Sequence, residues 1–144
     1  MHKASWILLA LVGALTLLGS LASLATAYRG TEDQIVPGGT TIEDVRAWRE
    51  DVATALKGRR GTASAYAASY AALFLCIVLI PYRRGEVWAW WALGGAALLF
   101  LVLTALRVPM LGYTLGIGTA VTQAAIVLVA LLLDVGRLRR PPPA

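Results

Sequence analysis

The segment PYRRGEVWAWWAL, residues 81–93, contains the residue types in this chain that are best suited to bind a ligand. Arg83 and Arg84 could bind lipid phosphates through charge-assisted hydrogen bonds, or could pair with Glu86. Three tryptophans follow at the start of the next apolar run, and indole rings prefer the headgroup zone of a membrane. The segment therefore predicts a turn at a membrane surface. Its candidate lipid or partner contacts are Arg83, Arg84, Trp88, Trp90 and Trp91.

The same segment carries a resemblance to a protein family. The pattern Tyr-Arg-Arg-Gly-Glu-x-Trp-Ala-Trp at residues 82–90 resembles a motif of small, uncharacterised bacterial four-helix membrane proteins. In those proteins the motif forms the turn before the third helix and the start of that helix. Gly85 suits such a turn because glycine adopts a positive φ without steric cost. The resemblance implies a fold and a bacterial origin, but no activity.

Residues that could catalyse a reaction or bind a metal are scarce. His2 is the only histidine and Cys76 the only cysteine, so paired histidine haem ligation, a cysteine zinc site and an intrachain disulfide are excluded. A hydrolase triad would lack its histidine base. Small multidrug exporters depend on an acidic residue within the membrane, whereas the first apolar run has hydroxyl side chains such as Thr16, Ser20 and Ser23. We predict no catalytic residue, no metal site and no cofactor.

The elements that position these residues are apolar runs of membrane-spanning length. The chain is 58% hydrophobic and only 15% charged, with a mean hydropathy of +0.70. A lipid core about 30 Å thick requires roughly 20 helical residues, and backbone groups inside lipid must be paired. The sequence predicts an all-α membrane protein, with four transmembrane helices in an antiparallel bundle and a single integral membrane domain over residues 1–144. The predicted helices cover residues 4–27, 62–82, 87–106 and 111–133.

The first run has an alternative interpretation. Lys3 precedes the apolar stretch, and Ala25-Thr26-Ala27 fits a signal-peptidase cleavage pattern. The uncharged stretch is longer than a usual signal core, and Trp6 and Tyr28 bracket it as interfacial anchors would. Retention as a helix is the interpretation we adopt, and cleavage is the alternative.

The loop between the first two runs predicts an amphipathic helix over residues 41–57. Thr41 can serve as its N-cap with Asp44 three residues on, and Gly58 as its stop. Arg46 and Glu50 have the spacing of a helical ion pair. The helix could cap the bundle or could form a lid over a ligand site. Its apolar face consists of Ile42, Val45, Trp48, Val52 and Leu56.

The last run has small residues at four-residue spacing, which allow two helices to approach closely. Gln123 is the single amide in that run and should seek a partner in the protein interior. The candidate helix-packing residues are Gly112, Gly116, Ala120, Gln123 and Ala124. A protein partner or a second copy could bind through helix 111–133.

The charge pattern bears on location and partners. The formal net charge is +5, but the basic residues flank apolar runs and form no stripe, so we predict membrane lipid as a partner and no nucleic acid. With four spans, both termini and the turn at Arg83 and Arg84 lie on one side. The short basic turn and the signal-like start favour the cytoplasmic side of a bacterial inner membrane, in a multi-pass arrangement.

Three functions fit these features. The first is a non-catalytic membrane subunit or scaffold, with an exposed apolar seam along the small residues of helix 111–133. The second is a small oligomeric transport or permeation module, with a polar cavity lined by Thr119, Thr122 and Gln123. The third is an interfacial enzyme acting on lipid headgroups, in which loop carboxylates converge with Arg29 or Arg107. Those carboxylates are Glu32, Asp33, Glu43 and Asp44.

Overall fold

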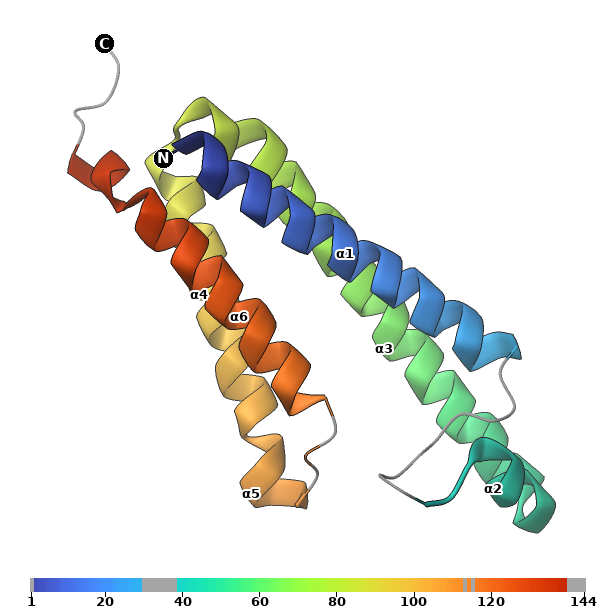
Figure 1. The fold of residues 1–144 in the computed structure, drawn as a ribbon. Coiled ribbons are helices and arrows are strands. Elements are labelled where there is room, and N and C mark those ends of the chain that lie inside the picture. The colour runs from blue at the N-terminus through green and yellow to red at the C-terminus, as the bar shows by residue number, and fades with distance from the viewer. Residues whose placement is uncertain (1, 30–38, 113, 115, 140–144) are drawn as a thin grey trace. The chain divides into compact units, whose positions relative to one another are not determined.

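The computed structural model describes residues 2–29, 39–112, 114 and 116–139, and these residues form helices with no β-strand among them (Figure 1). The elements are α1 (His2–Arg29), α2 (Ile42–Trp48), α3 (Glu50–Ile77), the π-helical segment η1 (Val78–Tyr82), α4 (Val87–Ala105), α5 (Arg107–Leu111), α6 (Ile117–Leu133) and the short 3-10 helix η2 (Val135–Arg139). Glu32, Asp33 and Arg140 lie outside the described residues.

Three stretches are long and apolar enough to cross a membrane, which indicates a membrane protein. They are Lys3–Arg29, Glu50–Tyr82 and Val87–Leu111. These stretches contain the first three predicted helices. The fourth predicted span, residues 111–133, corresponds to the shorter apolar helix α6.

The chain forms two compact units, and α1 and α3 contribute to both. One unit comprises Met1–Ala14 with Leu73–Ala144, and the other is Leu15–Ala72. In the first unit α4 and α6 lie side by side (Figure 1). The buried core of this unit consists of Leu9, Val12, Phe74, Val78, Tyr82, Ala89, Leu93, Ala97, Val127, Ala130 and Leu131. On α4 the buried positions recur every four residues, so one stripe of the helix packs inward and the remaining apolar surface faces outward.

The second long helix begins earlier than the sequence predicts. α3 runs from Glu50 through Gly58 without a break, so the expected stop at Gly58 and the expected start at residue 62 are wrong. Gly58 has no positive φ, and a glycine inside a helix costs only about 1 kcal/mol relative to alanine. The apolar stretch that follows Gly58 favours helix, and this preference outweighs the cost of the glycine.

The predicted loop helix over residues 41–57 is divided at Arg49. This residue is extended, with φ −149° and ψ 103°, and its guanidinium donates two hydrogen bonds to the Asp51 carboxylate. The acidic start of α3 suits the positive end of a new helix dipole. Because the helix breaks here, the predicted apolar face is not continuous. Ile42 is buried, whereas Trp48 is 78% exposed.

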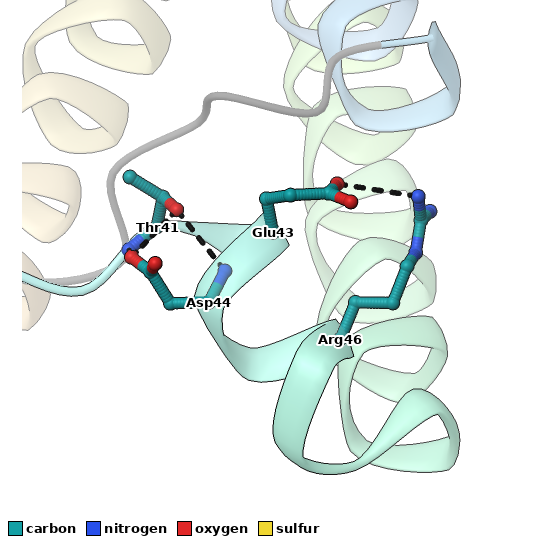
Figure 2. A network of polar contacts seen from close by, with 4 residues as sticks. All are labelled: Thr41, Glu43, Asp44 and Arg46. Atoms are coloured by element: carbon teal, nitrogen blue, oxygen red, sulfur yellow. Dashed lines mark hydrogen bonds and ion pairs between the residues drawn. The ribbon is translucent and has the colours of Figure 1, made fainter.

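A capping box begins α2, as predicted. The Thr41 hydroxyl accepts a hydrogen bond from the Asp44 amide at 3.2 Å, and the Asp44 carboxylate accepts one from the Thr41 amide at 2.7 Å (Figure 2). Arg46 pairs with Glu43 at 3.3 Å rather than with the predicted partner Glu50. Glu50 belongs to the next helix, so the i,i+4 geometry that the prediction assumed does not exist.

The predicted helix over residues 111–133 begins six positions later, because two glycines adopt left-handed conformations. Gly112 has φ +62° and ends α5, and Gly116 has φ +81° and precedes α6. Neither residue lies in a helix, so the expected packing line from Gly112 through Gly116 is wrong. The other two small residues of that line, Ala120 and Ala124, are buried in α6 as a packing role requires.

Candidate functional site

The turn between η1 and α4 has the geometry that its glycine predicts. Gly85 has φ +94°, which confirms the need for a residue without a side chain at this position. The Gly85 amide donates to the Tyr82 carbonyl at 3.1 Å, and the Glu86 amide donates to the Pro81 carbonyl at 3.0 Å. Pro81 cannot donate a backbone hydrogen bond, and it lies in the π-helical segment where the regular helical pattern is already interrupted.

The two arginines of the turn are exposed and differ in their surroundings. The Arg83 guanidinium carbon lies 5.1 Å from the centroid of the Trp6 ring, within the range of a cation–π interaction. Arg84 is exposed at the next position. The Glu86 carboxylate accepts a hydrogen bond from the Trp88 indole at 2.5 Å. In this turn Arg83 therefore lies against the Trp6 ring, and Glu86 bonds to Trp88.

The three tryptophans of α4 separate into an outward pair and an inward residue. Trp88 is 54% exposed and Trp91 is 62% exposed. Trp90 is half-buried, and its indole N–H donates to the Leu131 carbonyl of α6 at 3.0 Å. Its ring also meets Trp91 edge to face, with centroids 4.8 Å apart. Trp88 and Trp91 are thus available to lipid or a partner, whereas Trp90 fixes α4 to α6.

Beneath the turn, three elements meet at the Ser5 hydroxyl. Ser5 Oγ donates to the Ala130 carbonyl at 2.6 Å and lies 2.5 Å from the Tyr82 hydroxyl. A serine hydroxyl has one proton, so Tyr82 is the donor in the second hydrogen bond. Ser5, Tyr82 and Ala130 are fully buried. This network joins α1, η1 and α6, and no pattern in the sequence around Ser5 predicts it.

Side chains of other helices donate hydrogen bonds to carbonyl groups at the C-terminal end of α6. The last four carbonyl groups of a helix have no partner within the helix. Ser5 supplies a donor to the Ala130 carbonyl, and Trp90 supplies one to the Leu131 carbonyl. The Asp134 amide also donates to Leu131, at 3.1 Å. The Ser5 side chain therefore supplies a donor to the Ala130 carbonyl from another helix, and the Leu131 carbonyl accepts from both the Trp90 side chain and the Asp134 backbone.

The acidic residues of this unit do not form a metal site. Asp134 caps the C-terminal end of α6 and is buried, with 8% of its surface exposed. Glu86 is half-buried in the turn. Among the residues that the structure describes, no three His, Cys, Asp or Glu side chains are grouped as metal ligands.

The remaining candidates lie on or near α6. Ala120 and Ala124 are buried on this helix, which packs along α4, and Gln123 is half-buried. Thr119 is exposed, and its hydroxyl donates to the Gly116 carbonyl at 2.7 Å. Ala120 and Ala124 thus serve packing within the chain, whereas Gly118, Thr122 and Ala125 of the same helix are exposed.

Taken together, the turn offers cationic and indole groups at the surface, held by a buried polar network. Such a surface can bind anionic headgroups or a partner, and it contains no arrangement of nucleophile and base. Comparison with protein-family models, with curated proteins and with solved structures finds no match to this chain.

Proposed function

We propose that the protein is a small, non-catalytic subunit or scaffold of a bacterial inner membrane that packs against lipid or a partner protein. One observation carries the proposal. In the most apolar windows of the three long helical stretches, only 22%, 22% and 17% of residues are buried inside the chain. Apolar surface of this extent needs a cover other than water. Lipid and a membrane partner are the covers available to helices of spanning length.

In this proposal α6 is the fourth transmembrane helix of an antiparallel bundle. Its 17 residues extend over about 26 Å at 1.5 Å per residue, a few Å less than an average lipid core. A short span is tolerated by local thinning of the bilayer. The side-chain donors from Ser5 and Trp90 support the proposal, because carbonyls at a helix end in lipid need partners from the protein.

The turn gives the proposed orientation. Arg83 and Arg84 would lie among cytoplasmic headgroups, with Trp88 and Trp91 at the interface beside them. With four spans, the termini are then cytoplasmic as well. The resemblance of residues 82–90 to bacterial four-helix membrane proteins is consistent with this arrangement and adds no activity to it.

A partner would meet α6 on its outward face. Ala120 and Ala124 are buried within the chain, so these two of the small residues that the sequence suggested for partner binding already pack against the chain itself. The exposed face instead presents Val121, Ile126, Leu128, Val129 and Leu132. We propose that a partner or a second copy packs on this larger apolar face.

The transport and enzyme hypotheses gain no specific support. The two grooves described within residues 15–72 are not lined by Thr119, Thr122 or Gln123. On α2 the Glu43 carboxylate pairs with Arg46, and the Asp44 carboxylate accepts a hydrogen bond from Thr41 in the capping box. Both carboxylates therefore bond to residues of the same short segment.

The test is extraction from native membrane in mild detergent, followed by native mass spectrometry. The proposal predicts a stoichiometric protein partner or a second copy, together with lipid. Val129→Trp should weaken that association because the ring would obstruct the outward face of α6. Leu99→Trp, at an exposed position of α4, is the matched control and should leave it intact. A monomeric chain that retains a non-lipid small molecule would contradict the proposal.

A further inference from the structure

A groove in the unit formed by residues 15–72 runs along one face of α3. Its volume is about 440 Å³ and it is open at the surface. The three- and four-residue spacings among its described lining residues put them on one side of the helix. These residues are Ala55, Gly58, Arg59, Thr62, Ala63 and Tyr66. At 1.5 Å per residue, the groove extends about 17 Å along the helix axis.

Arg59 is the charged side chain on this face, and it is exposed. Among the residues that the structure describes, its guanidinium takes part in no hydrogen bond or ion pair. Arg46 and Arg49 of the same unit differ, because each pairs with an acidic residue close to it in the chain. The five N–H donors of Arg59 are therefore available to a ligand.

The helix itself brings no acid to Arg59. On an α-helix the side chains beside a given residue are those three and four positions away. For Arg59 these are Ala55, Leu56, Thr62 and Ala63. The Thr62 hydroxyl donates to the Gly58 carbonyl at 3.0 Å. An arginine in these surroundings matches an anionic oxygen ligand, which it can bind through two parallel hydrogen bonds.

Small residues leave space next to the guanidinium. Ala55, Gly58 and Ala63 line the groove on both sides of Arg59 along the helix. A Cβ added to Gly58 would meet no atom within 4 Å. The groove therefore has room for a ligand that is larger than a simple ion.

The groove crosses the level at which α3 changes from charged to uncharged. Residues 61–82 carry no charge. Arg59 lies about 3 Å before Gly61 along the helix axis, and Tyr66 lies about 8 Å after it, at 1.5 Å per residue. Tyr66 is 75% exposed, and tyrosine is typical of the membrane interface. With α3 as a membrane span, Arg59 is at headgroup depth and Tyr66 at the edge of the lipid core.

An amphipathic anion uses both ends of this groove. A free anion would contact Arg59 and leave the part around Ala63 and Tyr66 unoccupied. A phospholipid has a phosphate for the guanidinium, and its ester and methylene groups lie next to that phosphate on the side of the lipid core. A zwitterionic headgroup also brings an ammonium group that Arg59 repels, so an anionic headgroup is favoured.

We propose that this groove binds an anionic phospholipid, with the phosphate at Arg59 and the start of an acyl chain beside Ala63 and Tyr66. The site rests on the membrane insertion proposed above, and it names the lipid class that the protein retains. It does not depend on the outward face of α6 or on a protein partner.

The experiment measures retained lipid by native mass spectrometry of the full chain released from nanodiscs. Nanodiscs of phosphatidylcholine with a minor fraction of phosphatidylglycerol serve as the probe. The wild-type chain should retain one phosphatidylglycerol selectively. Arg59→Gln should reduce its retention about tenfold, the scale of one charge-assisted interaction.

A second variant blocks the groove and keeps the charge. Gly58→Leu should also reduce retention of phosphatidylglycerol, because the side chain fills the open space beside Arg59. Leucine favours helix over glycine, so thermal unfolding of this variant in detergent should occur at no lower temperature than in the wild type. Retention at the wild-type level in Gly58→Leu would overturn the groove as the binding place.

Lys57→Gln is the matched control. It removes the same charge two residues away, about 160° around the helix from Arg59 at 3.6 residues per turn. Retention should be unchanged in this variant. Equal losses for Lys57→Gln and Arg59→Gln would overturn the site, because attraction to surface charge alone would then explain them. Displacement of the lipid by millimolar inorganic phosphate would overturn the lipid assignment in favour of a free anion.

Failure of the site is distinguishable from failure of the proposed function. If the site is wrong, the chain still enters nanodiscs and the Arg59→Gln variant retains the same lipids as the wild type. If membrane insertion is wrong, the wild-type chain does not enter nanodiscs, and an alkaline wash releases it from native membrane.

Discussion

The Ser5 hydroxyl donates a hydrogen bond to the Ala130 carbonyl at 2.6 Å, across 125 positions of the chain. The contact ties the start of α1 to the last turn of α6, and Tyr82 completes it from η1. In lipid no water reaches a buried carbonyl, so a side-chain donor from the protein stabilises it. The contact explains how an apolar helix that ends among other helices satisfies its terminal backbone groups.

Loss of the Ser5 hydroxyl should destabilise the first compact unit. Ser5→Ala removes the donor to Ala130 and the acceptor of Tyr82, and we expect a loss of about 1–2 kcal/mol in unfolding free energy. Tyr82→Phe should cost less, because Ser5 can still donate to Ala130. In a double-mutant cycle the two changes should be coupled by about 0.5 kcal/mol or more. Steric-trapping unfolding in bicelles measures these values.

The control for this cycle is Ser69→Ala. Its hydroxyl donates to the Ala65 carbonyl on the same helix at 3.0 Å and is exposed. This change should alter stability by only a few tenths of a kcal/mol. Additive effects of Ser5→Ala and Tyr82→Phe would show that the two hydroxyls do not act together.

The two left-handed glycines before α6 should resist substitution. Gly112→Ala and Gly116→Ala place a side chain where φ is +62° and +81°, and each should cost about 1–2 kcal/mol. Gly118→Ala is the matched control inside α6, where an added Cβ meets no atom within 4 Å. That change should be neutral or stabilising by up to about 1 kcal/mol, because alanine favours helix. Thermal unfolding in detergent compares the three, and an equal loss at Gly118 would argue against the conformational explanation.

The two neighbouring tryptophans should differ in their effect on stability. Trp90→Phe removes the indole donor to the Leu131 carbonyl and should cost about 1 kcal/mol. Trp91→Phe changes a ring that is 62% exposed and should leave stability nearly unchanged. In membranes containing brominated lipid, quenching should fall more for Trp91→Phe than for Trp90→Phe, because Trp91 is the more exposed fluorophore. The reverse order in both measurements would contradict the inward assignment of Trp90.

The capping box of α2 should weaken in acid. Hydrogen bonds from the Thr41 amide and then from its hydroxyl lower the pKa of the Asp44 carboxyl below its ordinary value (Figure 2). A lowered folded-state pKa means that the stabilisation is present above the ordinary pKa of an aspartate and is lost as pH falls through the folded value. Hydrogen exchange at the Val45 amide, which bonds to the Thr41 carbonyl at 3.2 Å, should therefore be protected less at low pH.

Thr41→Ala provides the check on this pH dependence. Without the hydroxyl, the Asp44 pKa should rise toward its ordinary value, as carbon-detected NMR of the carboxyl would measure. The first turn of α2 should lose about 1 kcal/mol of stability at neutral pH. An unchanged Asp44 titration in this variant would contradict the hydroxyl's part in the shift.

Sequence alone predicted those features that depend on neighbouring residues or on overall polarity. The length of an apolar run predicts a long helix because lipid admits few alternatives. Gly85 and the pairing of Thr41 with Asp44 follow from local backbone geometry, and the structure has both. The break at Arg49 was missed, since both sides of it favour helix and only the competing acidic start of α3 indicates it.

Features that depend on distant contacts escaped prediction. The four-residue spacing of Gly112 and Gly116 is typical of small residues that pack along a helix. Glycine is equally typical of a left-handed turn, so the sequence does not distinguish the helix from the turn. Ser5 gives no local sign that it meets Tyr82, 77 positions away. Ser23 and Arg60 likewise lie on two different helices, 37 positions apart, and their contact exists only once those helices lie together.

The central claim is that lipid covers the outward faces of the long helices, and Cys76 tests it directly. This single cysteine is exposed on α3 within the uncharged stretch of residues 61–82. In intact membrane vesicles a water-soluble maleimide should leave Cys76 unlabelled, because the reactive thiolate needs water, and SDS should make labelling complete. The positive control is Thr54→Cys in a Cys76→Ala background. It should react with the same maleimide in vesicles that are opened so that the reagent reaches both faces of the membrane. Labelling of Cys76 in intact membrane at the rate of that control would contradict the account.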